Sequence, residues 1–210
     1  MLFRSKNTDV RAGLFGAPTS NLKADDDGIN PRFALAYKPS DDLLFYGSAS
    51  KGFRRGGANN IIAIPSSCDA EIQALGYTSA PATFESDNLW HYEVGTKGSV
   101  GNGALSFDAA AFRIDWKNQQ QNVFLPQCGF NLGANIGGSK IDGFELAATL
   151  RPTERLSVDL SLGYLDARVA EDTPQANAFK GDRLPLAPPW TVSASTCVPP
   201  TAARTSSPWG

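Results

Sequence analysis

Apolar and polar residues alternate along most of this chain with a period of two. Residues 156–166 show the pattern most cleanly, because Leu156, Val158, Leu160, Leu162 and Tyr164 alternate with Ser157, Asp159, Ser161, Gly163 and Leu165. Successive side chains of a strand point to opposite faces of a sheet, so this pattern predicts a strand with one apolar face. The longest apolar runs are about four residues, whereas a membrane-spanning helix needs about 20.

The same alternation predicts about six further strands. They are expected over 30–38, 43–51, 89–99, 104–117, a segment ending at residue 150, and 190–196. In the segment ending at residue 150, one face carries Phe144, Leu146, Ala148 and Leu150. The predicted strand over 104–117 changes its apolar face after Phe107, which indicates a bulge or phase slip near 108–111.

The connections between these strands are alternately short and long. The short ones, 39–42, 100–103 and 151–155, contain the Gly, Pro, Asn and Asp residues of tight turns. The long ones cover about 52–87, 118–135 and 167–185. Long links at one end and short links at the other are typical of outer-membrane barrels. We therefore predict an all-β fold, an antiparallel up-and-down meander of about seven strands that forms a partial segment of a transmembrane β-barrel.

Charge and composition narrow the function classes. The 210 residues include 19 basic and 21 acidic side chains and no basic stripe, so nucleic acid is not an expected partner. A Ser-His-Asp or Cys-His apparatus would have to be built around His91, the single histidine, which shares the polar face with Glu93. We predict no enzyme, no catalytic residue and no cofactor.

Neither the acidic run nor the cysteines indicate a metal site. An EF-hand frame ending at Gly28 would place Lys23 at the first ligand position and Ala34 at the twelfth. The three cysteines, Cys68, Cys128 and Cys197, have no metal-ligand spacing. One disulfide with a leftover thiol and three unpaired thiols both remain open at this point.

Four sequence blocks carry a family resemblance. SKGFRRGG follows a predicted strand, and LWHYEVGTK, IDGFELAATLRPTERLSVDLSLGYLDA and GDRLPLAPPW come later in the same order as in the family. The chain resembles the TonB-dependent receptors. The resemblance implies a 22-stranded barrel around a plug domain, in the outer membrane of a Gram-negative cell. It implies active uptake of a bulky scarce nutrient, an iron–siderophore complex before haem, cobalamin or carbohydrate. The implied partners are outer-membrane lipid, the plug, the TonB energy-coupling system and the extracellular ligand.

Seven strands cannot close such a barrel, and the sequence contains neither a plug nor a TonB-contacting box. We therefore interpret the chain as a barrel fragment whose export relies on a segment outside this sequence. Residues 1–29 are expected to form a partial strand and extracellular loop, and 30–196 the partial barrel. Residues 197–210 are interpreted as an irregular tail that a shift in reading frame would explain.

The barrel interpretation assigns roles to individual residues. Four charged residues are expected to face the lumen: Glu93, Lys97, Glu145 and Asp159. Eight apolar residues are expected to face lipid: Phe144, Leu146, Leu150, Leu156, Val158, Leu160, Leu162 and Tyr164. Cys68 and Cys128, in consecutive long connections, form a candidate disulfide. Its closed segment of about 60 residues implies about 4 kcal/mol of stabilisation.

One alternative of a different class is a secreted β-sandwich that acts as a binding module. In a sandwich, the apolar stripe from Leu156 to Tyr164 would be covered by a second sheet instead of facing lipid.

Overall fold

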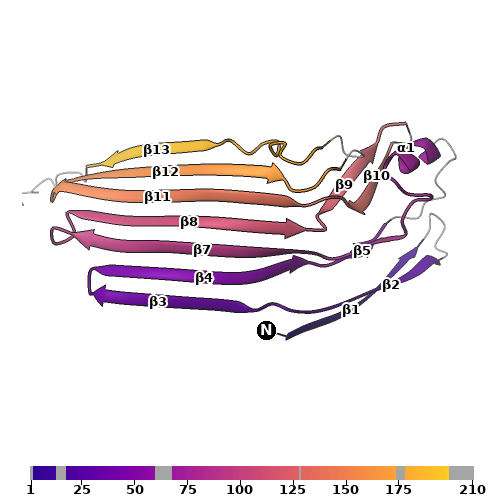
Figure 1. Ribbon diagram of the computed structural model, residues 1–210, viewed down its shortest axis with the longest axis horizontal. Coiled ribbons are helices and arrows are strands. Elements are labelled where there is room, and N and C mark those ends of the chain that lie inside the picture. Colours follow the sequence, from indigo (N-terminus) through magenta and orange to yellow (C-terminus); the bar gives the residue numbers. More distant parts are fainter. Residues whose placement is uncertain (1, 13–17, 60–67, 128, 174–177, 199–210) are drawn as a thin grey trace, which may run out of the picture.

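The computed structural model describes residues 2–12, 18–59, 68–127, 129–173 and 178–198. Its main element is an antiparallel sheet of seven strands in the order β13-β12-β11-β8-β7-β4-β3 (Figure 1). The strands are β3 (Arg32–Ser40), β4 (Leu43–Arg54), β7 (Asp87–Val100), β8 (Leu105–Lys117), β11 (Ser139–Thr153), β12 (Leu156–Val169) and β13 (Trp190–Cys197). Each long strand pairs with the long strands before and after it, so the predicted meander is confirmed.

The short and long connections lie at opposite ends of the sheet (Figure 1). The first long connection contains β5 (Gly57–Ala58), α1 (Asp69–Ala74) and β6 (Thr83–Phe84), and the second contains the hairpin of β9 (Gln120–Leu125) and β10 (Phe130–Asn135). Where a partial strand and a loop were expected, β1 (Leu2–Ala12) and β2 (Pro18–Ile29) pair as a hairpin. These elements are too short or too polar to show a clear alternation in the sequence.

The first two long connections share a small hydrophobic core. It consists of Cys68, Ile72, Leu125 and Leu132, which are at most 3% exposed. The carboxylate of Glu71 on α1 also accepts a hydrogen bond from the backbone N–H of Gln127, at 3.1 Å to Oε1. The helix α1 therefore packs against the β9–β10 hairpin as one unit.

The predicted phase slip in β8 is wrong. The pairing of β8 with both neighbours continues without a shift from Leu105 to its far end. Phe112, Ile114 and Trp116 do lie on the face opposite Leu105, because a regular strand carries even and odd residues on different faces. Near the long connections the apolar side chains simply change face, and the Phe112 ring lies 6.0 Å from the His91 ring. Register shifts occur instead beside short turns, between Leu150 and Thr153 and between Tyr37 and Ser40.

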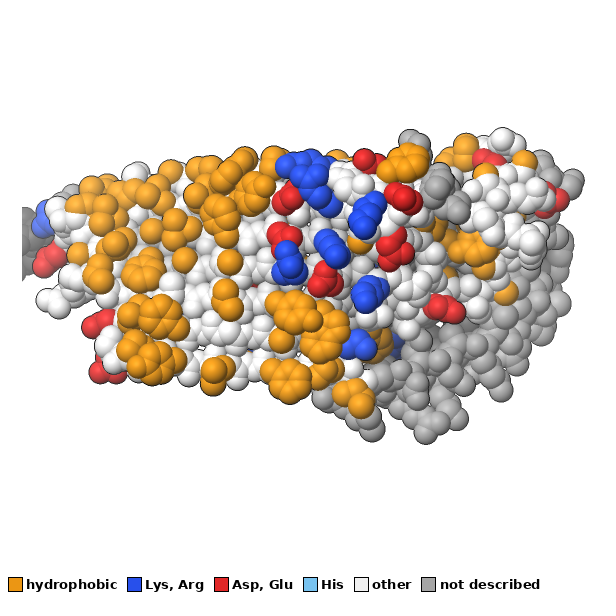
Figure 2. Space-filling view, in the orientation of Figure 1, with side chains coloured by type: hydrophobic (Ala, Val, Ile, Leu, Met, Phe, Trp, Pro, Cys, Tyr) orange, Lys and Arg blue, Asp and Glu red, His pale blue; other side chains and the backbone are white. Residues whose placement is uncertain are grey.

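One face of the sheet carries an apolar surface. The cross-strand pairs Phe144–Tyr164, Leu146–Leu162 and Leu150–Val158 place the expected apolar residues of β11 and β12 on the same face. Leu146, Leu150 and Leu160 are 39–48% exposed. Figure 2 shows this apolar surface over the part of the sheet towards the short turns. No helix in the described part of the chain has the length and apolar character needed to cross a bilayer.

The tolerance of glycine positions gives a test of this packing. A Cβ at Gly143 would lie 2.8 Å from the Tyr164 carbonyl oxygen and 2.5 Å from the Phe112 ring, whereas at Gly163 the nearest atom is 3.9 Å away. We predict that Gly143→Ala lowers the free energy of unfolding by about 1–3 kcal/mol through overpacking. Urea denaturation of the protein in detergent measures this change.

The matched control is Gly163→Ala, on the neighbouring strand and the same face. It should leave the unfolding midpoint unchanged or raise it slightly, because alanine restricts the unfolded chain more than glycine does. Equal destabilisation by both substitutions would contradict the packing described around Gly143.

Candidate functional site

The face opposite the apolar surface is hollow and polar. A cavity of about 670 Å³ lies on it, lined by residues that include Tyr46, Glu93, Lys97, Asp108 and Glu145. Three carboxylates against one ammonium give the cavity an acidic excess. Such a surface favours a basic occupant, because complementary charge steers and orients association.

Most of the predicted lumen charges have partners within the sheet. Lys97 Nζ lies 2.5 Å from Asp108 Oδ2, and Glu93 Oε2 lies 3.6 Å from His91 Nε2. The Thr149 hydroxyl donates to Asp159 at 2.6 Å. The structure thus brings Glu93, Lys97 and Glu145 to one cavity and places Asp159 nearer the short turns. The sequence interpretation missed Asp108, which the β7–β8 pairing sets opposite Lys97.

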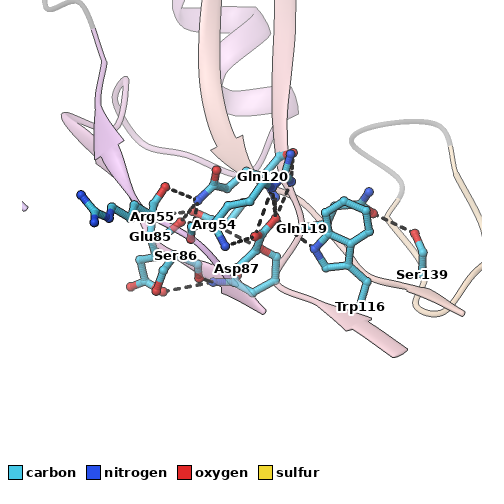
Figure 3. Close-up of polar contacts among 11 residues, drawn as sticks. Arg54, Arg55, Glu85, Ser86, Asp87, Trp116, Gln119, Gln120 and Ser139 are labelled. Atoms are coloured by element: carbon cyan, nitrogen blue, oxygen red, sulfur yellow. Dashed lines mark hydrogen bonds and ion pairs between the residues drawn. The ribbon is translucent and has the colours of Figure 1, made fainter. Parts of the chain in front are cut away.

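A second polar cluster closes the sheet at its long-connection end (Figure 3). Its centre is Asp87, which is 1% exposed. The Asp87 carboxylate accepts hydrogen bonds from Trp116 Nε1 at 3.0 Å, from the Gln120 backbone N–H at 3.1 Å and from Arg54 Nε at 2.9 Å. It also accepts from the backbone N–H and Nη2 of Arg54. A buried carboxylate needs such partners to remain ionised.

Strand register explains why these residues meet. Arg54, the last residue of β4, pairs with Asp87, the first residue of β7. The guanidinium of Arg54 lies 4.7 Å from the ring of Trp116, near the end of β8. The side-chain amide of Gln120 donates to the carbonyls of Arg55 at 2.8 Å and Glu85 at 2.9 Å. We call Arg54, Asp87, Trp116 and Gln120 the Asp87 clasp, because they hold the first and second long connections together.

The electrostatics of the clasp favour the ionised carboxylate. Burial alone would raise the pKa of Asp87, but the hydrogen bonds from Arg54, Gln120 and Trp116 and the positive charge of Arg54 together hold that pKa below its usual value. The clasp could not be predicted from the alternation pattern, which ends one predicted strand at Lys51 and begins the next at Leu89. Extending both by three and two residues would have set Arg54 opposite Asp87.

The predicted disulfide is only partly visible. Cys68 is completely buried in the core under α1, while Cys128 lies outside the described residues, so their pairing stays a prediction. Cys197 is exposed with a free thiol. Among the described residues, no three His, Cys, Asp or Glu side chains are grouped to hold a metal ion.

Comparison with known proteins decides the family. The family described as "TonB dependent receptor-like, beta-barrel" has a model that matches residues 3–210. The chain belongs to this family of TonB-dependent receptors. The earlier resemblance is thereby confirmed, and so is the assignment of the sheet to a partial barrel of that kind.

The alignments with curated relatives cover part of this chain and a small part of each relative. The metal-pseudopaline receptor CntO of Pseudomonas aeruginosa is 26% identical over 156 residues, which is 73% of this chain and 18% of that receptor. The probable TonB-dependent siderophore receptor PiuA of Acinetobacter baumannii is 27% identical over 105 residues, which is 46% of this chain and 14% of PiuA. The chain thus spans less than a fifth of the length of these two curated relatives.

Solved structures agree on the fold. The ferric yersiniabactin uptake receptor FyuA from Yersinia pestis superposes with a TM-score of 0.64 at 21% identity, over 88% of this chain and 25% of FyuA. The siderophore receptor PiuA from Acinetobacter baumannii gives a TM-score of 0.61 at 19% identity, over 88% of this chain and 26% of PiuA. At these identities the likeness shows the fold of TonB-dependent receptor barrels.

The Asp87 clasp generates a prediction about acid stability. In the full-length receptor containing this chain, Asp87→Asn should lower the free energy of unfolding at pH 7 by about 2–3 kcal/mol, because the carboxamide has one acceptor oxygen in place of two and no negative charge to pair with Arg54. The folded-state pKa of Asp87 is depressed, so its contribution is complete above the unfolded pKa of about 3.9 and is lost as pH falls through the folded value. The difference between wild type and variant should therefore shrink in acid.

Urea unfolding between pH 7 and pH 3, together with limited proteolysis of the two long connections, measures both effects. Asp41→Asn is the control, since that carboxylate is 99% exposed in a surface ion pair with Lys38, and it should change little. A constant difference between wild type and Asp87→Asn across this pH range would contradict the role assigned to the ionised carboxylate.

Proposed function

We propose that this chain is part of the barrel of an outer-membrane receptor that imports a bulky scarce nutrient, with an iron–siderophore or related metal chelate as the first candidate. The family supports uptake, and the relatives' names support the ligand class. These names are a metal-pseudopaline receptor, a siderophore receptor and a ferric yersiniabactin uptake receptor. We propose no chemistry on the ligand.

The observation that carries the membrane part of this proposal is the length of the apolar surface. Leu156 to Tyr164 on β12 spans eight residue steps, which is about 27 Å along the strand. At the tilt of roughly 35–45° found in barrel strands, this length covers about 19–22 Å of membrane thickness. Outer-membrane barrels have an outward apolar band about 25 Å tall. We therefore propose that the eight residues predicted to face lipid, Phe144 to Tyr164 on β11 and β12, do so in the receptor.

The hollow polar face supports the rest of the proposal. Barrels of this size class have a plugged lumen, and the acidic cavity around Glu93 and Glu145 suits a partner that presents basic groups. We propose that this face meets the plug domain, and that the TonB system supplies energy through the plug. Cys68 and Cys128 are proposed to cross-link the first and second long connections on the extracellular side.

The β-sandwich alternative is not favoured. A sandwich needs a second sheet packed on the apolar stripe, yet the described strands that form this stripe belong to one sheet and their large apolar side chains are at least partly exposed.

The assignment of faces can be tested by paired substitutions in the full-length receptor. Leu160→Arg would place a charge at the apolar surface, where a charge near the midplane of the bilayer costs about 2–4 kcal/mol. We predict that it impairs folding into detergent or bilayer. The measurement is the fraction of receptor molecules that stay folded, and so migrate as the folded form, on a denaturing gel without heating. Ser161→Arg, one residue further on the opposite face, should be tolerated much better. The reverse result would invert our assignment of the two faces.

Uptake is tested in a strain from which the receptor gene has been deleted, with growth on a ferric siderophore as the only iron source. The full-length receptor should restore growth and accumulation of labelled iron, whereas residues 1–210 alone should not. In the described sheet, β3 and β13 each have one unpaired edge, which lipid cannot hydrate. Uptake by residues 1–210 alone would exclude the transport mechanism proposed here, and failure of the full-length receptor with a panel of metal chelates would exclude the ligand class.

A further inference from the structure

A belt of charged side chains borders the apolar surface on the side of the long connections. Figure 2 shows it between the apolar part of the sheet and the long connections. The strand pairing builds it from two rows, Arg113–Asp142–Asp166 and Asp115–Lys140–Arg168. We call the following residues the charged belt: Arg113, Asp115, Lys117, Lys140, Asp142, Asp166, Arg168 and Arg183.

An aromatic row separates the charged belt from the apolar rows. Phe144, Tyr164 and Trp190 lie side by side on β11, β12 and β13, with ring centroids 5.7 Å apart for Phe144–Tyr164 and 4.7 Å for Tyr164–Trp190. Aromatic girdles mark the boundary between the lipid tails and the headgroups in outer-membrane barrels. The charged belt begins two residues beyond this row, about 7 Å further along each strand. It therefore lies at the depth of lipid headgroups if the proposed membrane placement holds.

The charged belt is basic, although the chain as a whole is not. Its five Arg and Lys residues face three Asp residues, whereas the complete chain has a net charge of −2. Two of the three carboxylates engage guanidinium groups. Arg113 Nε lies 2.6 Å from an Asp142 oxygen, and Arg168 and Arg183 lie 2.8 Å and 3.5 Å from Asp166 oxygens. The third, Asp115, lies opposite Lys140 in the strand pairing. The positive excess is thus concentrated at one level of the outward face.

Several cationic groups of the charged belt remain available. Arg113, Arg168 and Arg183 keep side chains that are 45–59% exposed. Lys117 and Lys140 are exposed, and neither side chain makes a hydrogen bond or ion pair with another described residue. Guanidinium and ammonium groups with spare N–H donors are the usual ligands of phosphate.

We propose that the charged belt binds phosphate groups of lipid headgroups in the leaflet at the long-connection end. This inference rests on the proposed membrane placement, but not on the ligand that is transported. A lipid fits better than a ligand of the cavity, because the belt continues the outward apolar surface and lies on the opposite face from Glu93 and Glu145. Lipid chains would cover the apolar rows while the phosphates of the same molecules meet the belt.

The test measures binding of bisphosphorylated lipid A to the purified full-length receptor in neutral detergent, by native mass spectrometry and by titration. The variant Lys140→Gln/Arg168→Gln removes two cations from the charged belt. Each basic residue near a membrane surface contributes roughly a fivefold factor in affinity, so binding should weaken about 25-fold. Lys38→Gln/Arg155→Gln is the matched control, since it removes one Lys and one exposed Arg beside the short turns, and it should bind like wild type.

A second arm separates phosphate recognition from contact with the acyl chains. Dephosphorylated lipid A should bind wild type at least as weakly as bisphosphorylated lipid A binds the belt variant, because it lacks the group that all five cations of the belt would contact. Equal binding of both lipids by wild type, or equal binding of the phosphorylated lipid by the belt variant and the control, would overturn the proposal. If the double variant does not fold, Lys140→Gln alone serves, because it breaks no ion pair with another described residue and should weaken binding about fivefold.

The outcomes distinguish this inference from the proposed function. Loss of lipid A binding in the belt variant, with normal uptake of labelled iron, would support lipid binding by the charged belt and would not affect the proposed transport function. Normal phosphate-dependent binding in a receptor that imports no metal chelate would support the belt and reject the proposed ligand class.

Discussion

Backbone hydrogen bonds between neighbouring strands hold this sheet together, because its middle has no buried hydrophobic core. The buried apolar residues of the described chain all lie in the long connections or at the strand ends beside them: Cys68, Ile72, Leu125, Leu132, Ala134, Ile136, Ala167 and Val169. Between those ends and the short turns, both faces of the sheet remain open. The pairing of each strand with its sequence neighbours therefore satisfies the backbone while leaving the side chains to face two different surroundings.

The change of surroundings along each strand explains the distribution of apolar residues. On β8, the face that carries Leu105 and Phe107 is apolar near the short turn and charged at Arg113 and Asp115, whereas the other face carries Asp108 first and Phe112 later. Apolar side chains thus move from the outward face to the inward face as the strand approaches the long connections. Charged side chains move from the inward face to the outward face over the same stretch. At the long-connection end, the Asp87 clasp and the small core at α1 cover the end of the sheet.

Short-range alternation was enough to predict the meander, the order of the strands and the residues that share the apolar face of β11 and β12. It failed in two kinds of place. A change of face on β8 was interpreted as a bulge, because an alternation pattern cannot distinguish a shifted strand from a regular strand that crosses between environments. The Asp87 clasp was missed because its members come from four separate elements, and only the register of β4 against β7 brings Arg54 to Asp87. The partner of Cys68 belongs to the same class of long-range information, and the strand pattern alone does not supply it.

The core shared by α1 and the β9–β10 hairpin limits how the long-connection end of this sheet can diverge in sequence. Ile72 from one connection and Leu132 from the other pack in the same small core. A change of side-chain volume at either position therefore has to be matched by a change at the other. Natural variation in these two connections should accordingly be correlated, even though about 60 residues separate the two positions. Grafting one connection into another receptor would transfer half of a packing interface, and a graft that carries both would transfer a complete one.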